Sequence, residues 1–212
     1  MAHVLSVNVG RPRAVGTGRR TVTTAIWKTP IADRVHVHGV NLDGDDQADR
    51  SVHGGPDKAV YGYAIEEIRD WERELGRELG PGIFGENLTC EGLDVSGALV
   101  GERWRVGTTL LEVAQPRLPC FKLGLRMGDP SFVRRFGSAS RPGAYLRIVE
   151  EGELGAGDAI DVDVVHLPAH GVTVRMVSDA ILLDGTLIPH VLEAPQLPQS
   201  LREWMGARAS YS

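Results

Sequence analysis

Residues 110–123 read Leu-Leu-Glu-Val-Ala-Gln-Pro-Arg-Leu-Pro-Cys-Phe-Lys-Leu. The first five of them, Leu110–Ala114, are a compact β-strand candidate, because they form a short apolar run that is broken by a single charged residue. Pro116 and Pro119 then fix the backbone that leads to Cys120, since a proline ring locks φ and removes an N–H donor. The segment therefore predicts a strand that ends in a stiff loop carrying a thiol.

Short strand candidates of the same kind occur through the first 170 residues, and several alternate apolar and polar side chains with a period of two. Turn signals rich in glycine separate them. The candidates are Val4–Val9, Thr21–Trp27, Val35–His38, Trp104–Val106, Tyr145–Val149 and Ile160–Val164. Many short strands without a regular strand–helix alternation predict a mainly β (α+β) fold built on a closed or partly closed β-barrel.

Helix signals are fewer and are concentrated near the end of the chain. Residues 65–75 carry an apolar stripe with helical spacing, and residues 131–136 predict a short helix. The last forty residues contain three short helix candidates, at 172–182, 187–193 and 200–207. Because such a bundle is too small to fold alone, we expect it to pack on the barrel or on another chain. The predicted domains are a barrel over residues 1–168 and a three-helix unit over residues 169–212.

Composition narrows the class of protein. The chain has 212 residues, of which 24% are charged and 42% hydrophobic, and this composition excludes a disordered or fibrous chain. Its net charge of −5 argues against a general nucleic-acid-binding surface. No apolar run reaches the length of a membrane span, and the first residues lack the pattern of a secretion signal. We therefore expect a cytoplasmic protein without a membrane segment.

The two cysteines have different surroundings. Two thiols exclude a disulfide framework and a four-thiolate zinc site. Arg117 and Lys122 flank Cys120, and nearby cations favour the thiolate, which is both the nucleophile and the metal-binding form. The alternative for Cys120 is a buried cysteine that acts as a small apolar residue. Cys90 has no cationic neighbours in the sequence, so a structural role is expected for it.

A second candidate stretch, residues 49–61, combines glycines with positive charge. Gly54 and Gly55 let the backbone come close to a ligand and offer N–H groups to an anion. Arg50, His53 and Lys58 surround that turn, so a phosphate is a natural occupant. The alternative is a glycine-rich β-turn with charged residues on the surface.

The third stretch, residues 82–88, places Glu86 and Asn87 between apolar residues. The Asn87 amide offers both a donor and an acceptor, which suits the edge of a heterocycle. The alternative is a turn that the asparagine side chain stabilises. A nearby acidic run, Asp43–Asp49, lacks the ligand pattern of a calcium loop, and we interpret it as a solvated acidic loop.

Taken in order, these stretches resemble the MOSC (molybdenum cofactor sulfurase C-terminal) domain, in its stand-alone YiiM-like branch. The resemblance covers the chain from about Val4 to its end. Each matching segment alone is weakly specific for the family, but all of them in this order are strongly specific. The segments are Val7–Gly10, Thr24–Pro30, Asp45–Asp49, His53–Tyr61, Phe84–Thr89, Gln115–Cys120 and Gly143–Arg147.

The resemblance implies a barrel that holds the molybdenum cofactor (Mo-molybdopterin), with Cys120 as the metal ligand. It implies that the remaining cofactor-binding residues are Lys28, Thr29, Arg50, His53, Gly54, Gly55, Lys58, Glu86, Asn87 and Arg117. The cations among them would bind the phosphate of the pterin, while Glu86 would contact the cofactor or orient a basic neighbour. Either His53 or Asp57 is the expected proton donor.

The expected reaction is the reduction of N-hydroxylated bases or related N–O compounds. No further cysteine exists for an iron–sulfur cluster, so an external reductase would supply the electrons. Two alternatives stay open, namely sulfur transfer by a Cys120 persulfide and a non-catalytic molybdopterin-binding module. The apolar tail helices make a homodimer plausible. Relatives of this family often carry Trp at the positions of Phe121 and Ala144, which implies less aromatic area near the pocket here.

Overall fold

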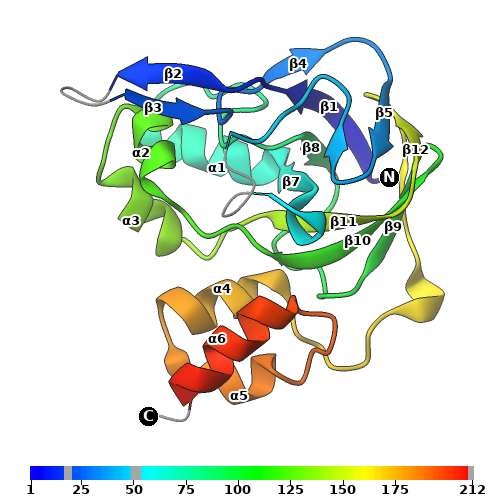
Figure 1. The fold of residues 1–212 in the computed structure, drawn as a ribbon, viewed down its shortest axis with the longest axis vertical. Coiled ribbons are helices and arrows are strands. Elements are labelled where there is room, and N and C mark those ends of the chain that lie inside the picture. The colour runs from blue at the N-terminus through cyan, green and yellow to red at the C-terminus, as the bar shows by residue number, and fades with distance from the viewer. Residues whose placement is uncertain (17–20, 49–53, 210–212) are drawn as a thin grey trace.

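The computed structural model describes residues 1–16, 21–48 and 54–209 of the chain, and Figure 1 shows its fold. Its main layer is an eight-stranded mixed sheet with the strand order β13-β9-β10-β11-β7-β8-β1-β4. The strands of this sheet are β1 (His3–Val9), β4 (Thr29–Ile31), β7 (Val60–Ala64), β8 (Leu88–Glu91), β9 (Arg103–Val106), β10 (Thr109–Pro116), β11 (Ala144–Glu150) and β13 (Ile160–Val162).

Backbone hydrogen bonds bring the β13 end of this sheet back to β1. His3 forms an antiparallel bridge with Ala159. The Val4 amide donates to the Asp158 carbonyl at 2.9 Å, and the Gly157 amide donates to the Val4 carbonyl at 2.8 Å. Because the strands from β13 to β1, seven of the eight, make up this closed part, the sheet curls into a barrel that is largely closed.

Two smaller sheets extend the barrel. One has the order β12-β5-β6 and the other is a hairpin of β2 and β3. Their strands are β2 (Arg13–Gly16), β3 (Thr21–Thr24), β5 (Val35–His38), β6 (Asn41–Leu42) and β12 (Gly152–Leu154). The predicted strands at 21–27 and 160–164 are thus shorter than expected, since they end at Thr24 and Val162, and the remaining predicted strands are confirmed.

Helices pack against one flank of the barrel around a cluster of aromatic rings. They are α1 (Ile65–Leu75), α2 (Phe121–Met127) and α3 (Phe132–Gly137), while the short 3-10 helix η1 (Pro56–Lys58) contacts β10 and β11. The apolar stripe of α1 buries Ile68 and Trp71, as its helical spacing predicts. The Trp71 ring stacks on Phe136 with 5.9 Å between ring centroids. This aromatic cluster fixes α2 and α3 beside the strand that leads to Cys120.

Three helices gather at the end of the chain, below the sheet in Figure 1. They are α4 (Val174–Leu182), α5 (Ile188–Val191) and α6 (Gln199–Ala209), with the 3-10 turns η2 (Val164–His166) and η3 (Gly185–Leu187) before and between them. Thr173 caps α4, because its side chain accepts a hydrogen bond from the Met176 amide. The predicted boundary at residues 168 and 169 falls in the linker after η2.

The core of the C-terminal helices is continuous with the core of the barrel. Buried side chains of the helices, such as Val177, Val191 and Met205, belong to the same apolar cluster as Trp104 and Leu111 of the sheet. The helices are therefore packed on the barrel as expected. Within the described ranges, no helix is long and apolar enough to cross a membrane.

Candidate functional site

A cleft opens where β10 ends and where the segments after β3 and β6 meet the sheet. It encloses about 690 Å³ of space, including the solvent at its mouth. Its wall combines four basic side chains with a single thiol: Lys28, Lys58, Arg117, Lys122 and Cys120. The cleft therefore offers positive charge and one soft ligand atom in the same place.

Cys120 stands at the junction of the strand β10 and the helix α2. It has an extended backbone, with φ of −129° and ψ of 171°, and its carbonyl accepts a hydrogen bond from the Leu123 amide at 2.9 Å. Its side chain is partly exposed and lines the cleft. The predicted loop after Pro119 is thus shorter than expected, because a helix begins directly after the cysteine. This arrangement holds the thiol at a fixed position on the wall of the cleft.

Cys90 is more deeply buried than Cys120. It lies on β8 with no exposed surface, and burial raises the pKa of its thiol to about 12. A thiol with this pKa stays protonated at neutral pH. The expected structural role of Cys90 agrees with this environment.

Arg117 is a buried cation without an acidic partner among the described residues. Arg117 is 5% exposed, and its Nη1 atom has no hydrogen-bond acceptor among the described residues. The guanidinium lies 5.6 Å from the ring centroid of Tyr61 and 5.5 Å from that of Phe136. Burial opposes its charge, but the nearby Tyr61 and Tyr145 outweigh burial and raise the pKa of Arg117. The cleft therefore keeps a permanent positive charge beside the thiol.

A buried ion pair forms another part of the cleft wall. Both carboxylate oxygens of Asp45 accept hydrogen bonds from Lys28 Nζ. Asp45 also accepts from the Gly10 amide at 2.7 Å and from Asn87 Nδ2 at 2.9 Å. The side chains of Lys28 and Asp45 are 9% and 2% exposed, and burial lowers the pKa of Lys28. The interpretation of Asp43–Asp49 as a solvated acidic loop is therefore wrong at Asp45.

Asn87 lines the cleft but already uses much of its hydrogen-bonding capacity inside the protein. Its Oδ1 atom accepts from the Tyr61 amide at 3.1 Å, and its Nδ2 atom donates to Asp45 and to the Asn8 carbonyl. One further lone pair of Oδ1 is left for a ligand. The amide thus joins β1, β7 and the acidic loop at the cleft wall.

Gln47 adds a second polar atom that has no partner. Its Nε2 atom donates to the Lys58 carbonyl at 3.3 Å, while its buried Oε1 atom has no donor among the described residues. Both residues line the cleft, and burial lowers the pKa of Lys58. The cleft thus contains one acceptor without a donor, Gln47 Oε1, and one donor without an acceptor, Arg117 Nη1. Such atoms are expected of a site that is completed by a polar ligand.

Four predicted site residues that the structure describes, namely Thr29, Gly54, Gly55 and Asp57, do not line the cleft. Thr29 is exposed at the start of β4, and Gly54 and Gly55 precede η1. Asp57 pairs with Arg147, with 2.5 Å between Oδ1 and Nε. Arg50 and His53 lie outside the described residues. The positions with departures from the family pattern also lie away from the wall, since Phe121 is 57% exposed and Ala144 is buried in the core.

Glu86 lies in the protein interior beneath the cleft. Its carboxylate accepts hydrogen bonds from the amides of Gly82 and Phe84, at 2.5 and 3.0 Å, and from Thr89 Oγ1 at 3.1 Å. Burial raises the pKa of Glu86, although these donors oppose the shift. Gly82 adopts φ of +79°, and a Cβ atom there would come 2.8 Å from the Lys28 carbonyl. Glu86 therefore shapes the loop that packs behind Lys28.

Sequence reasoning missed several residues of the cleft, among them four with polar side chains: Asp45, Gln47, Tyr61 and Tyr145. All four lie within segments that carried the family resemblance, so their position in these segments was the available signal. None has a local pattern that indicates a ligand site on its own.

The barrel, the cleft and the single thiol on its wall define the class of protein. The chain belongs to the MOSC domain family, whose model matches residues 49–161.

Individual relatives agree with this assignment. YflK of Bacillus subtilis (strain 168) is 34% identical over 202 residues, which cover 94% of this chain and 90% of YflK. The crystal structure of YiiM from Geobacillus stearothermophilus has a TM-score of 0.79 at 27% identity, and the alignment covers 98% of this chain and 99% of YiiM. A protein named "Reductase" from Gibberella moniliformis (strain M3125 / FGSC 7600) is 30% identical over 201 residues, which cover 93% of this chain but 35% of that longer protein.

Proposed function

We propose that this protein binds the molybdenum cofactor in the cleft, with Cys120 as the molybdenum ligand, and reduces N-hydroxylated bases or related N–O compounds. The observation that carries the proposal is the combination of one partly exposed thiol with four basic side chains in a single cleft. Membership of the MOSC family and the relative named as a reductase support it.

The donor set fits this cofactor. A thiolate is a soft ligand and suits a molybdenum centre that is also held by sulfur. The cofactor carries a phosphate, for which Lys58 and Arg117 supply charge, and a heterocycle, for which Gln47 Oε1 and Asn87 supply acceptors. When bound, the cofactor supplies two-electron and oxygen-atom transfer chemistry.

The protein residues bind, orient and shield the reacting groups. Cys120 fixes the position of the metal because its backbone is held between β10 and α2. Arg117 stabilises negative charge beside the thiol, and the buried pair of Lys28 and Asp45 keeps its part of the wall rigid. We retain His53 and not Asp57 as the candidate proton donor, because the Asp57 carboxylate already pairs with Arg147.

The proposed reaction balances in atoms and in electrons. An N–OH group takes up two electrons and two protons and becomes N–H, and one water molecule leaves. Because Cys90 is buried and Cys120 is the metal ligand, no thiol is left for an iron–sulfur relay in this chain. The electrons are therefore assigned to a separate reductase protein that delivers them one at a time.

The test uses the full chain produced in a host that makes the cofactor. An aromatic amidoxime is offered as substrate, with reduced viologen as the electron donor, and amidine formation is measured. We expect turnover that depends on molybdenum and is absent in Cys120→Ser. A persulfide on Cys120 without molybdenum would favour sulfur transfer instead. Stoichiometric pterin without turnover of any N–O substrate would favour a non-catalytic binding module.

A further inference from the structure

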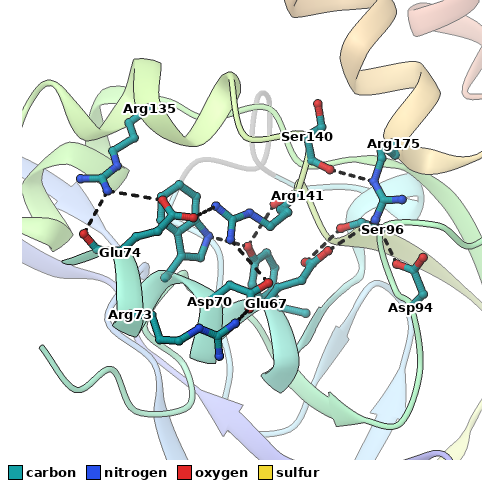
Figure 2. Close-up of polar contacts among 12 residues, drawn as sticks. Glu67, Asp70, Arg73, Glu74, Asp94, Ser96, Arg135, Ser140, Arg141 and Arg175 are labelled. Atoms are coloured by element: carbon teal, nitrogen blue, oxygen red, sulfur yellow. Dashed lines mark hydrogen bonds and ion pairs between the residues drawn. The ribbon is translucent and has the colours of Figure 1, made fainter. Parts of the chain in front are cut away.

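Many arginines of this chain form ion pairs with acids, and Figure 2 shows a dense example between the barrel and the C-terminal helices. We call it the α1–α4 cluster, and its central members are Glu67, Asp94, Ser96, Arg141 and Arg175. Arg175 Nη2 of α4 donates to Asp94 Oδ1 at 3.1 Å, and Arg141 Nη2 donates to Glu74 Oε1 at 2.6 Å. The positive charges of this cluster are therefore balanced within the chain.

The positive charge of the sequence is concentrated in two segments. Residues 1–32 contain no aspartate or glutamate, and residues 117–141 contain six basic side chains and one acidic side chain. Both segments border the cleft, through Lys28 and Lys122 respectively. The net charge of the whole chain is −5, so an otherwise acidic protein is basic beside the cleft that holds Cys120.

The helix α2 presents part of this charge away from the protein core. Its buried residues are Leu123, Gly124 and Met127. Because successive residues of a helix are rotated by about 100°, Phe121, Lys122 and Arg126 lie on the opposite side. Lys122 and Arg126 are four positions apart and therefore neighbours on the helix surface. Lys122 also lines the cleft, so the charged side of α2 continues into the cleft wall.

Arg126 shares a tryptophan ring with a second arginine. The guanidinium of Arg13 in β2 lies 4.3 Å from the centroid of the Trp27 ring, and that of Arg126 lies 5.8 Å from it. Neither arginine has an ion pair with an acid among the described residues, and the buried Arg126 Nε has no acceptor there. Burial lowers the pKa of Arg126, Glu86 opposes this shift, and Arg13 adds to it. Two like charges are thus held close together, which an anionic surface would relieve.

Two exposed apolar side chains lie beside these cations. Leu118 lines the cleft and is 40% exposed, while Phe121 directly follows Cys120 and is 57% exposed. Protein interfaces combine an apolar centre with a polar rim, and those of electron-transfer partners are small. We call these residues together the α2 face, and they are Arg13, Leu118, Phe121, Lys122 and Arg126.

We propose that the α2 face is the docking surface for the electron donor, a protein with an acidic surface around its redox centre. The inference rests on the proposed function, because that reaction needs electrons from a separate protein. Electron transfer falls steeply with distance, so the donor has to dock beside the cleft, and the α2 face adjoins Cys120. Opposite charges steer such encounters. Each encounter oxidises the donor by one electron, and two encounters supply the two electrons that one N–OH reduction consumes.

The first test measures binding and needs neither cofactor nor turnover. The probe is a flavodoxin, an acidic one-electron donor, and it is titrated by calorimetry into the full chain at ionic strengths of about 20 and 200 mM. We expect affinity that falls with salt and that is about tenfold weaker in Arg13→Gln/Arg126→Gln at the lower ionic strength. Arg13→Gln alone, a change on an exposed strand, should show a smaller loss in the same direction.

The matched control is Arg34→Gln/Arg105→Gln. It removes the same charge from two arginines that pair with Asp158 and Glu150, near β5 and β9 on the side of the molecule opposite α2 (Figure 1). This variant should bind flavodoxin like the unmodified chain. Equal losses in the two double variants, or no loss in either, would overturn the α2 face.

The second test measures amidoxime turnover with reduced flavodoxin and, separately, with reduced viologen. Arg13→Gln/Arg126→Gln should lose about tenfold in kcat/KM for flavodoxin and keep its turnover with viologen, because neither arginine lines the cleft. Flavodoxin turnover equal to that of the unmodified chain would overturn the proposal. No viologen turnover in the unmodified chain would count against the proposed function instead, and the binding titration would then decide about the α2 face.

Other anionic partners are tested in the same way. Phosphatidylglycerol vesicles and a DNA duplex replace flavodoxin in the titration at the lower ionic strength. We expect both to bind more weakly than flavodoxin. Tighter binding of either probe, weakened in Arg13→Gln/Arg126→Gln, would overturn the assignment of the α2 face to an electron donor.

Discussion

The cleft at Cys120 and the α1–α4 cluster are both polar, but they differ in how many of their charged groups have a partner within the chain. In the cleft, the guanidinium of Arg117 has no acidic partner among the described residues, and Gln47 Oε1 has no donor. In the cluster, Arg175 contacts Asp94 and a backbone carbonyl, and Glu67 has Ser96. The cleft therefore has the unpaired polar atoms expected of a ligand site, whereas the cluster holds two parts of the same chain together.

The largest expected effect separates the two cysteines. Cys120→Ser should reduce turnover of an N–O substrate by about 1,000-fold or more, because a hydroxyl does not replace a thiolate as a soft metal ligand. Steady-state assays on protein of equal concentration measure this loss. Cys90→Ala is the control and should keep the activity, since Cys90 lies in the core. A fully active Cys120→Ser protein would remove the thiol from the proposed mechanism.

The next effect tests the buried pair in the cleft wall. Asp45→Asn should lower the free energy of unfolding by about 3 kcal/mol at pH 7, because Lys28 is then buried without a counter-charge. Burial already lowers the pKa of Lys28 below its value in the unfolded chain. A lysine of this kind destabilises the fold as the pH falls, so the loss should shrink at higher pH.

Urea unfolding of Asp45→Asn at pH 7 and pH 9.5 checks both statements. Asp43→Asn serves as the control, because the Asp43 side chain is 60% exposed, and it should change stability by less than about 0.5 kcal/mol. Equal, small effects of the two variants would contradict the role given to Asp45.

A smaller effect compares one arginine from each region. Arg117→Met should weaken binding of the molybdenum cofactor about 30-fold, which is the expected contribution of one hydrogen bond to a charged group. Arg175→Met should leave that affinity unchanged, because Arg175 belongs to the α1–α4 cluster. Cofactor retained after dialysis measures the difference. If both variants lose the cofactor equally, the two regions are not independent.

The smallest effect concerns the docking of α4. Ser140 has φ of +53°, and no other non-glycine residue in the described part of the chain has a positive φ. Its hydroxyl donates to Asp179 Oδ1 at 2.7 Å. Ser140→Ala should cost about 1 kcal/mol through loss of this bond. Ser140→Gly loses the same bond but relieves the left-handed strain, so its cost in urea unfolding should be close to zero. A larger cost for the glycine variant would contradict this balance.

Local chemistry was enough to predict some features. The strand before Cys120 was predicted and is observed as β10, and the apolar stripe of residues 65–75 predicted α1 with the observed bounds. The helix α2 was missed because its seven residues are too few for a clear stripe and contain Gly124.

Other features depend on contacts between distant parts of the chain. Asp45 reads as an acidic loop residue, yet Lys28 lies 17 positions before it and Asn87 lies 42 positions after it. Its burial comes from these contacts, which no local pattern encodes. The α1–α4 cluster has the same origin, since Glu67 and Arg175 are far apart in sequence and meet only when the helices dock.

The central claim is that Cys120 holds a molybdenum cofactor in the cleft. The most direct test is the molybdenum and pterin content of the protein purified from a host that makes the cofactor. We predict about one molybdenum and one pterin per chain in the unmodified protein and in Cys90→Ala, and loss of the molybdenum in Cys120→Ser. Absence of both molybdenum and pterin from the unmodified protein would contradict the claim.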